Sequence, residues 1–360
     1  MNMIFRWFGE NDDSVTLDQI RQIPGVRGIA GFLPDIPAGE VWPMERILEY
    51  KNNIESHGLQ LEVIESVNVH EDIKLGLPSR DKYIENYKET IKNLGKSGVR
   101  VICYNFMPVF DWLRTDLAYK LPDGSEVMYY DDDKLKGMDP VKLVENTEKN
   151  SNGFLLPGWE PDRLKELKNV LKLYDGMDEE KLFKNYKYFL EAIIPTCEKY
   201  DVKMAVHPDD PVWNVFGLPR IVHSKENLDR IIGLVDSPYN GITLCSGSLG
   251  SSTKNNIPEL IRYFGAKKRI HFAHVRNIKI LSEKHFHEVS HLSSDGSFDM
   301  FEIMKAFYDV GFDGYIRPDH GRMIWGEKAR PGYGLYDRAL GAAYLNGLWE
   351  AITKMNNRNR

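Results

Sequence analysis

The fold is decided by four short apolar segments, which read KMAVHPDD (203–210), GITLCSG (241–247), RIHFAHVRN (269–277) and GYIRPDHGR (314–322). Each has the composition of a buried strand and ends in a side chain that can bind a metal. These side chains are, in order, His207, Cys245, His274 and Asp319. The carboxyl ends of parallel barrel strands meet at one face, so we expect the four side chains to converge there.

Similar apolar runs occur along the whole chain and alternate with segments of helical periodicity, which indicates parallel βα units. The predicted strands are 3–8, 26–32, 59–64, 99–106, 202–207, 241–245, 269–275 and 315–318. The predicted helices include 44–56, 80–96, 178–200, 225–235, 298–310 and 336–351. Eight such units predict an α/β protein with a (β/α)8 TIM barrel.

An open doubly wound sheet is the main alternative to a barrel. Such a sheet usually carries a glycine-rich phosphate turn after its first strand, and the segment RWFGE (6–10) has no such pattern. The segment 110–175 breaks the βα alternation, so we predict one barrel domain over 1–360 with an insertion there, after strand four. On the carboxyl-end face this insertion would cover the active site or join a neighbouring subunit, unless it is only a solvated excursion.

Composition excludes several classes of protein. With 360 residues, 42% hydrophobic and 28% charged, the chain can bury a barrel-sized core. A net charge of −6 without a basic run disfavours nucleic-acid binding. Three widely spaced cysteines, Cys103, Cys197 and Cys245, predict no disulfide framework and a reducing cytoplasm. The N-terminus lacks a signal-peptide pattern and no run of eighteen apolar residues occurs, so we expect no membrane partner.

The four strand-end residues together form a donor set for a divalent cation. Two imidazoles, a thiolate and a carboxylate would carry a charge of about −2 at neutral pH, which a cation would balance. Taken alone, each of these residues could have a purely structural role, as a hydrogen-bonded histidine or a small buried cysteine does. Ligand softness favours Zn2+, whereas Mn2+ or Fe2+ becomes reasonable if substrate oxygens complete a larger shell.

Two further residues are candidates for proton transfer. His320 directly follows Asp319, so it would lie close to the cation and could act as a general acid or base. Tyr333 stands between two glycines, which allow a backbone to approach a ligand closely, although it could equally be an ordinary loop aromatic. The polar run 285–291 reads as a loop, either a lid near the active face or a solvated connection.

Nine short motifs resemble one enzyme family. They are FRWFG (5–9), IRQIPGV (20–26), GEVWP (39–43), AVHPDDP (205–211), FGLPR (216–220), CSGS (245–248), HVRN (274–277), RPDHG (317–321) and PGYG (331–334). Together they resemble, nearly end to end, the D-mannonate dehydratases of hexuronate breakdown. The resemblance implies a xylose-isomerase-like barrel and the loss of water from D-mannonate to give 2-dehydro-3-deoxy-D-gluconate. It also implies Mn2+ dependence. We therefore expect Mn2+ at the site, with Fe2+ as the alternative and Zn2+ ranked below both.

Carried over motif by motif, the resemblance implies site residues as well. The metal ligands would be His207, Cys245, His274 and Asp319, and the acid/base pair would be His320 and Tyr333. A sugar acid also needs cationic and polar contacts, because arginine matches a carboxylate with two hydrogen bonds. The candidates for those contacts are Arg6, Asn105, Arg276, Arg322 and Arg330. We further expect a homodimer or another homo-oligomer.

Three other functions compete with the dehydratase. A metal-dependent sugar isomerase would share barrel and cation but would need an aldose or ketose in place of a sugar acid. A barrel endonuclease would be expected to hold several metals and to show a basic face, and neither is clear here. A non-enzymatic scaffold would be expected to have lost ligand-capable residues from some strand ends, whereas all four remain.

Overall fold

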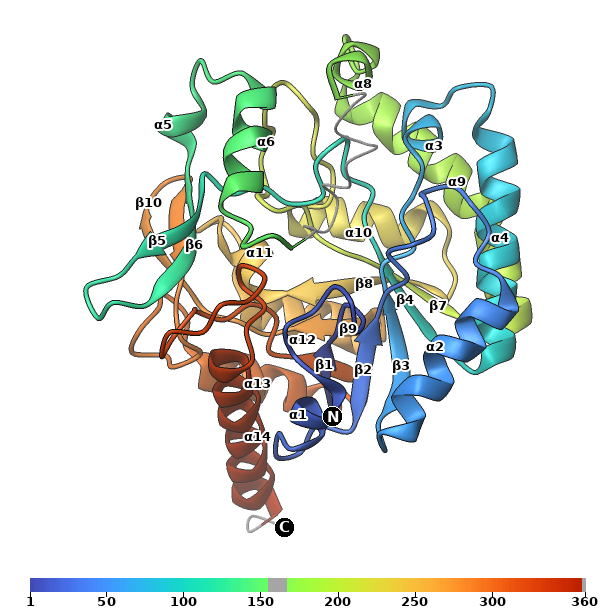
Figure 1. Cartoon of the computed structure of the whole chain (residues 1–360). Helices are drawn as coiled ribbons and strands as arrows, with labels where there is room; N and C mark the ends of the chain where they lie inside the picture. The colour runs from blue at the N-terminus through green and yellow to red at the C-terminus, as the bar shows by residue number, and fades with distance from the viewer. Residues whose placement is uncertain (155–166, 358–360) are drawn as a thin grey trace.

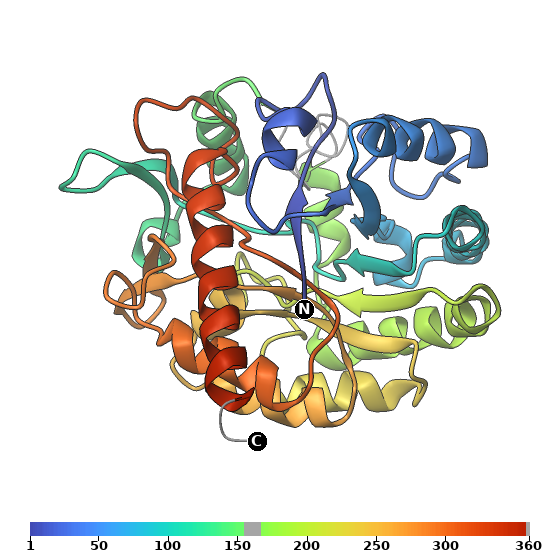
Figure 2. The same ribbon diagram turned by 90° about the horizontal axis from the view of Figure 1, so that it is seen from below.

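Eight parallel strands close into a barrel in this computed structural model, which describes residues 1–154 and 167–357 (Figures 1 and 2). In chain order the strands are β1 (Asn2–Arg6), β2 (Gly28–Gly31), β3 (Gln60–Glu65), β4 (Val101–Tyr104), β7 (Lys203–Val206), β8 (Asn240–Cys245), β9 (Ile270–His274) and β12 (Tyr315–Arg317). They follow one another around the barrel as β1-β12-β9-β8-β7-β4-β3-β2. The predicted (β/α)8 barrel is confirmed, and all eight carboxyl ends lie at one face.

Helices surround this barrel, as the view from below shows (Figure 2). The longer ones are α2 (Met44–Ser56), α4 (Arg80–Ser97), α9 (Glu179–Tyr200), α10 (Lys225–Leu234), α12 (Ile257–Ala266), α13 (Met300–Asp309) and α14 (Tyr336–Asn357). The shorter ones are α1 (Leu17–Arg21), α3 (Glu71–Leu75), α5 (Asp132–Leu135), α6 (Pro140–Lys149), α8 (Leu167–Leu173) and α11 (Ser246–Gly250). Asp178 caps the N-terminus of α9, and Gly98 ends α4 in the left-handed conformation (φ +95°).

Apolar side chains fill the barrel and the space around it. Inside the strands, a buried cluster includes Ile4, Val63, Val101 and Phe272. A larger cluster lies between the strands and the helices. Burial of this apolar surface holds the strand ends in fixed relative positions. None of the helices in the described parts of the chain combines the length and the hydropathy needed to cross a bilayer.

A second, antiparallel sheet lies outside the barrel. It consists of β5 (Asp116–Lys120), β6 (Glu126–Asp131), β10 (Ile278–Ser282) and β11 (His285–Glu288), in the order β10-β11-β6-β5. Two strands come from the predicted insertion and two from the connection between β9 and α13. Tyr130 pairs with Phe286 in register, and both belong to a separate apolar cluster. The interpretation of 285–291 as a loop is therefore wrong for 285–288, which pairs with a strand distant in sequence.

The predicted insertion is described only in part, because 155–166 lie outside the described residues. In Figure 1, α5 and α6 lie at the top of the molecule, whereas β1 begins at the bottom. The described part of this segment therefore lies toward the end of the barrel where the strands finish.

Candidate active site

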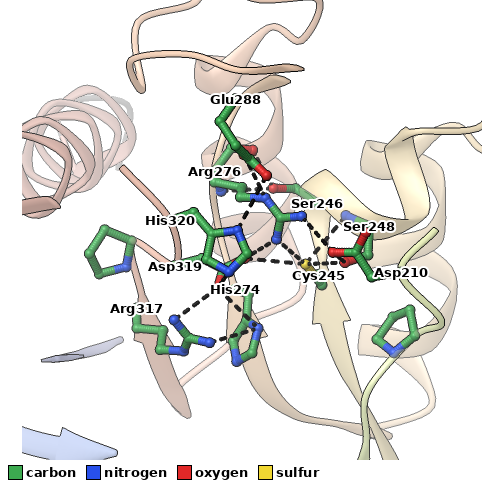
Figure 3. Close-up of polar contacts among 12 residues, drawn as sticks. Asp210, Cys245, Ser246, Ser248, His274, Arg276, Glu288, Arg317, Asp319 and His320 are labelled. Atoms are coloured by element: carbon green, nitrogen blue, oxygen red, sulfur yellow. Dashed lines mark hydrogen bonds and ion pairs between the residues drawn. The ribbon is translucent and has the colours of Figure 1, made fainter. Parts of the chain in front are cut away.

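The structure brings the four strand-end residues together, and Figure 3 shows three of them, Cys245, His274 and Asp319. The ligand atoms of His207, Cys245 and His274 all lie within 4.8 Å of one another. Oδ2 of Asp319 is 3.5 Å from Sγ of Cys245, and Oδ1 is 3.7 Å from Nδ1 of His274. Cys245 and His274 end their strands, whereas His207 and Asp319 follow one and two residues after theirs.

The orientation of the two imidazoles fits a shared cation. Nδ1 of His207 donates to the carbonyl oxygen of Pro208 at 2.7 Å, so Nε2 of the neutral ring carries no hydrogen. This Nε2 faces Nδ1 of His274 at 3.1 Å. Nε2 of His274 lies 3.5 Å from a carboxylate oxygen of Glu65, which favours a hydrogen on Nε2 and leaves Nδ1 bare. Two bare nitrogens at this distance repel each other, so the donor set fits a divalent metal between them.

Two buried arginines neutralise Asp319. Nη1 of Arg317 lies 2.8 Å from Oδ1 of Asp319, and Arg276 contacts the other carboxylate oxygen. Arg276 also donates to Sγ of Cys245 at 3.0 Å. Burial alone would raise the pKa of Asp319, but Arg276 and then His320 hold it well below its usual range. Asp319 is therefore an anion at neutral pH, as a metal-binding carboxylate must be.

His320 and Tyr333 form a hydrogen-bonded pair beside this donor set. Nε2 of His320 lies 3.0 Å from the hydroxyl oxygen of Tyr333. Burial lowers the pKa of His320 more than the nearby Asp319 raises it. Burial also raises the pKa of Tyr333 to about 12. At neutral pH the imidazole can thus accept a hydrogen bond from the phenol.

The turn that carries Tyr333 depends on the glycine before it. Gly332 has φ +79°, and a Cβ there would lie 2.5 Å from Cε of Met128 and 3.5 Å from Cγ of His320. The backbone N–H of Gly321 donates to the carbonyl of Gly332 at 2.9 Å. The glycine thus lets the tyrosine loop approach the histidine loop closely.

One cavity is lined by two of the four candidate metal ligands and by the His320–Tyr333 pair. It is lined by Arg6, Glu65, Ser66, Asn105, Asp111, Trp112, His207, Asp210, Arg276, Arg317, Asp319, His320 and Tyr333. Three of the five residues predicted to contact substrate, Arg6, Asn105 and Arg276, are among them. The cavity combines cationic and polar groups with the candidate metal ligands, as an anionic polyol would require.

The other two predicted contact residues lie outside this cavity lining. Arg322 forms an ion pair of 2.9 Å with Asp337 and borders a different surface depression. Arg330 forms an ion pair of 2.9 Å with Asp12, and its guanidinium lies 4.0 Å from the centroid of the Phe8 ring. Both arginines are thus paired with acidic residues of the chain itself.

Sequence reasoning missed three buried or half-buried acidic residues around the site. Glu65 is the last residue of β3, so the strand-end rule applied to the last four strands could have found it as well. Asp210 lies three residues after His207 and pairs with Arg114 at 2.7 Å. Glu288 lies 3.2 Å from Nδ1 of His320, and no local sequence signal distinguishes it, because its strand pairs with a remote segment.

Comparison with known proteins gives a consistent result over nearly the whole chain. The family model for D-mannonate dehydratase (UxuA) matches residues 1–359. The mannonate dehydratase of Thermotoga neapolitana is 66% identical over 358 residues, which is 99% of both chains. That of Lachnoclostridium phytofermentans is 63% identical over 98% of this chain and 99% of its own.

Solved structures agree with this relationship. The crystal structure of mannonate dehydratase from Streptococcus suis serotype2 superposes with a TM-score of 0.90 at 46% identity, covering 99% of this chain and 96% of that one. A xylose isomerase domain protein from Planctomyces limnophilus, at 12% identity and a TM-score of 0.54 over 98% and 99% of the two chains, shares the fold alone. The xylose-isomerase-like architecture and the predicted family are thereby confirmed, and the chain belongs to the D-mannonate dehydratase family.

Proposed function

We propose that this chain is a metal-dependent D-mannonate dehydratase, a hydro-lyase that removes water from D-mannonate to give 2-dehydro-3-deoxy-D-gluconate in hexuronate breakdown. Family membership over nearly the full length supports this activity. The observation that carries it is the placement of the His320–Tyr333 pair in one cavity with His207 and Asp319, two of the four clustered metal-binding side chains. A dehydration next to a carboxylate needs both parts, because it combines charge stabilisation with two proton transfers.

We assign the cation to His207, Cys245, His274 and Asp319. A bound divalent ion would stabilise the negative charge that develops on the substrate carboxylate as the adjacent C–H bond breaks. Mn2+ is the proposed ion and Fe2+ the alternative, since a substrate that adds oxygen donors would complete a five- or six-coordinate shell. Zn2+ suits the thiolate and imidazoles alone and ranks below both.

The two proton transfers are assigned to His320 and Tyr333. The substrate must lose the proton on C2, and the hydroxyl on C3 must leave with an added proton as water. His320 is neutral and presents Nε2 as an acceptor, whereas Tyr333 retains its proton and can donate it. We therefore propose that His320 takes the C2 proton and that Tyr333 protonates the leaving hydroxyl.

Binding of the sugar acid is assigned to the cavity residues Arg6, Asn105 and Arg276. Arg6 is the best suited, because it makes no ion pair with any residue that the structure describes. Its guanidinium donates to the carbonyl of Ala30 and lies 4.4 Å from the centroid of the Phe8 ring. A carboxylate entering the cavity would complete its hydrogen bonding. Arg322 and Arg330 would act indirectly, by bracing the loops after β12.

Metal removal and restoration tests this function. The purified protein is treated with EDTA and dialysed, and keto-acid formation from D-mannonate is followed after addition of Mn2+, Fe2+ or Zn2+. We expect no turnover without metal and the highest turnover with Mn2+. Xylose serves as the control substrate, because an isomerase would act on an aldose without a carboxylate. Equal activity before and after metal removal would contradict the proposal.

We also propose that the chain is a single barrel domain with an insertion, 110–175, on its carboxyl-end face. We propose further that the protein forms a homodimer or another homo-oligomer and that it works in the cytoplasm. Its three cysteines are all buried and free, which suits a reducing compartment. Size-exclusion chromatography with light scattering tests the oligomeric state.

A further inference from the structure

Glu288 joins the second sheet to the proposed catalytic pair. It is the last residue of β11, and its side chain is 1% exposed. Oε1 lies 3.2 Å from Nδ1 of His320 (Figure 3). The other ring nitrogen of His320 lies 3.0 Å from the hydroxyl of Tyr333. The imidazole is therefore held between a carboxylate on one side and a phenol on the other.

Two arginines fix the carboxylate of Glu288. Nε of Arg276 donates to Oε2 and Nη2 of Arg114 donates to Oε1, each at 3.0 Å. Burial alone would raise the pKa of Glu288, but Arg276, and then His320, lower it to about 2. Arg114 lies in the insertion, two residues before β5. The insertion therefore contributes one of the two arginines that hold Glu288 against His320.

We propose that Glu288 is a positioning residue, which accepts a hydrogen bond from Nδ1–H of His320 and so keeps Nε2 unprotonated and directed at Tyr333 and the cavity. This inference rests on the proposed function of the pair. Glu288 touches none of the four candidate metal ligands and does not line the cavity, so its effect on the reaction passes through His320. A carboxylate behind an imidazole fixes both the tautomer and the angle of the ring.

The proposed role differs measurably from a purely structural one. A buried charge that only stabilises the second sheet would, when removed, lower the melting temperature and the yield of folded protein. A positioning residue would instead lower kcat in protein that still folds, binds Mn2+ and binds substrate. A fall in kcat with an unchanged KM in folded protein would therefore indicate a positioning role, whereas a loss of folded protein would indicate a structural one.

Glu288→Gln is the variant that tests this, because it keeps the shape of the side chain. Its amide nitrogen can face Nδ1 and favour the opposite tautomer of His320. We expect kcat on D-mannonate to fall by at least about 10-fold, with KM within about 3-fold of wild type and an unchanged Mn2+ stoichiometry. Glu283→Gln, on the exposed turn of the same hairpin, is the matched control and should stay within about 2-fold in kcat. A folded, Mn2+-loaded Glu288→Gln protein with wild-type kcat, or with only KM changed, would overturn the inference.

A double-mutant cycle adds an independent readout. Glu288→Gln introduced into His320→Asn should change kcat by less than about 2-fold, since the ring that it positions is already gone. The same loss in both backgrounds would show a structural role and would also overturn the inference.

A second, charge-balanced variant keeps the proposal testable if the single variant does not fold. If Glu288→Gln alone does not fold, Glu288→Gln/Arg114→Gln removes one charge of each sign, and Asp210 keeps its ion pair of 3.0 Å with Arg276. The same loss of kcat is expected for it, with the same criteria. The wild-type protein tests the proposed function separately. If the wild type does not turn over D-mannonate with Mn2+, the proposed function and the role of Glu288 both fail. If the wild type and the Glu288→Gln variant are equally active, only the role of Glu288 fails.

Discussion

Nε2 of His320 lies 3.0 Å from the hydroxyl oxygen of Tyr333, and the two rings meet nearly edge to face, at 77° with centroids 5.0 Å apart. Both residues lie in the connection between β12 and α14. Because each ring is the hydrogen-bond partner of the other, loss of one changes the environment of the second. The pair is therefore expected to behave as one unit in mutagenesis.

Removing either proton-transfer group should abolish most of the turnover. His320→Asn and Tyr333→Phe are each expected to lose about 10²-fold or more in kcat, the range for a positioned acid or base. Because the pair acts as a unit, the double variant should lose much less than the product of the two single losses. Steady-state kinetics with a saturating Mn2+ concentration measures this, and metal analysis serves as the control. Near-wild-type kcat in both single variants would remove the pair from the mechanism.

The contact between Glu65 and His274 predicts an effect on metal affinity. Glu65→Gln loses the charged acceptor behind Nε2 of His274, so we expect Mn2+ to bind about 10- to 100-fold more weakly. Calorimetric titration of the metal-free protein measures the change. Glu62→Gln, on the same strand, is the control and should leave the affinity unchanged. Equal Mn2+ affinities for the Glu65 variant and the wild type would contradict this orientation of His274.

A methyl group at Gly247 should displace the arginine at the centre of the charge network. A Cβ there would lie 2.3 Å from Nε and 2.5 Å from Cζ of Arg276. Arg276 cannot move freely because it is hydrogen-bonded to Cys245 and to three carboxylates, so Gly247→Ala should lower kcat by about 10-fold or more.

The control is Gly233→Ala, another helical glycine, where a Cβ would meet nothing within 4 Å. That variant should retain activity and gain up to about 1 kcal/mol of stability from helix propensity. Kinetics and thermal melts on both proteins make the comparison, and full activity in Gly247→Ala would mean that Arg276 relocates without consequence.

Arg6 is expected to act on substrate affinity. Arg6→Gln removes a cation that faces the cavity without an ion-pair partner among the described residues, so KM for D-mannonate should rise roughly 10- to 100-fold, the equivalent of one charged hydrogen bond. We expect kcat to change by less than about 3-fold. Arg262→Gln, an exposed arginine on α12, is the matched control for loss of charge. An unchanged KM in Arg6→Gln would exclude a contact with the substrate carboxylate.

The barrel could be predicted because its signals are local. Each strand is a continuous apolar run, and parallel strands with helical crossovers place their carboxyl ends at one face. This single rule predicts that His207, Cys245, His274 and Asp319 lie together. The position of His320 followed from its neighbour in the chain, whereas Tyr333 was suggested by its motif alone.

The second sheet could not be predicted because its signals are distant. Tyr129 on β6 and His285 on β11 are 156 positions apart, and nothing in either segment alone indicates the other. The histidine-rich sequence of β11 also lacks the apolar alternation of a typical strand. Glu288 was missed for this reason. The ion pair of Arg330 with Asp12 was missed for a related reason, because the sequence around a loop arginine does not indicate which distant residue it will contact.

The antiparallel pairing of β6 with β11 affects which measurements can detect a damaging mutation in this enzyme. Tyr130 and Phe286 lie outside the candidate metal site. A substitution at either residue would weaken the packing between β6 and β11, which connects the insertion after β4 to Glu288 and so to the imidazole of His320. Circular dichroism would still report an intact α/β protein, and metal analysis a full complement of ion. A survey that measures only secondary structure and metal content would therefore miss such a variant, whereas steady-state kinetics would detect it.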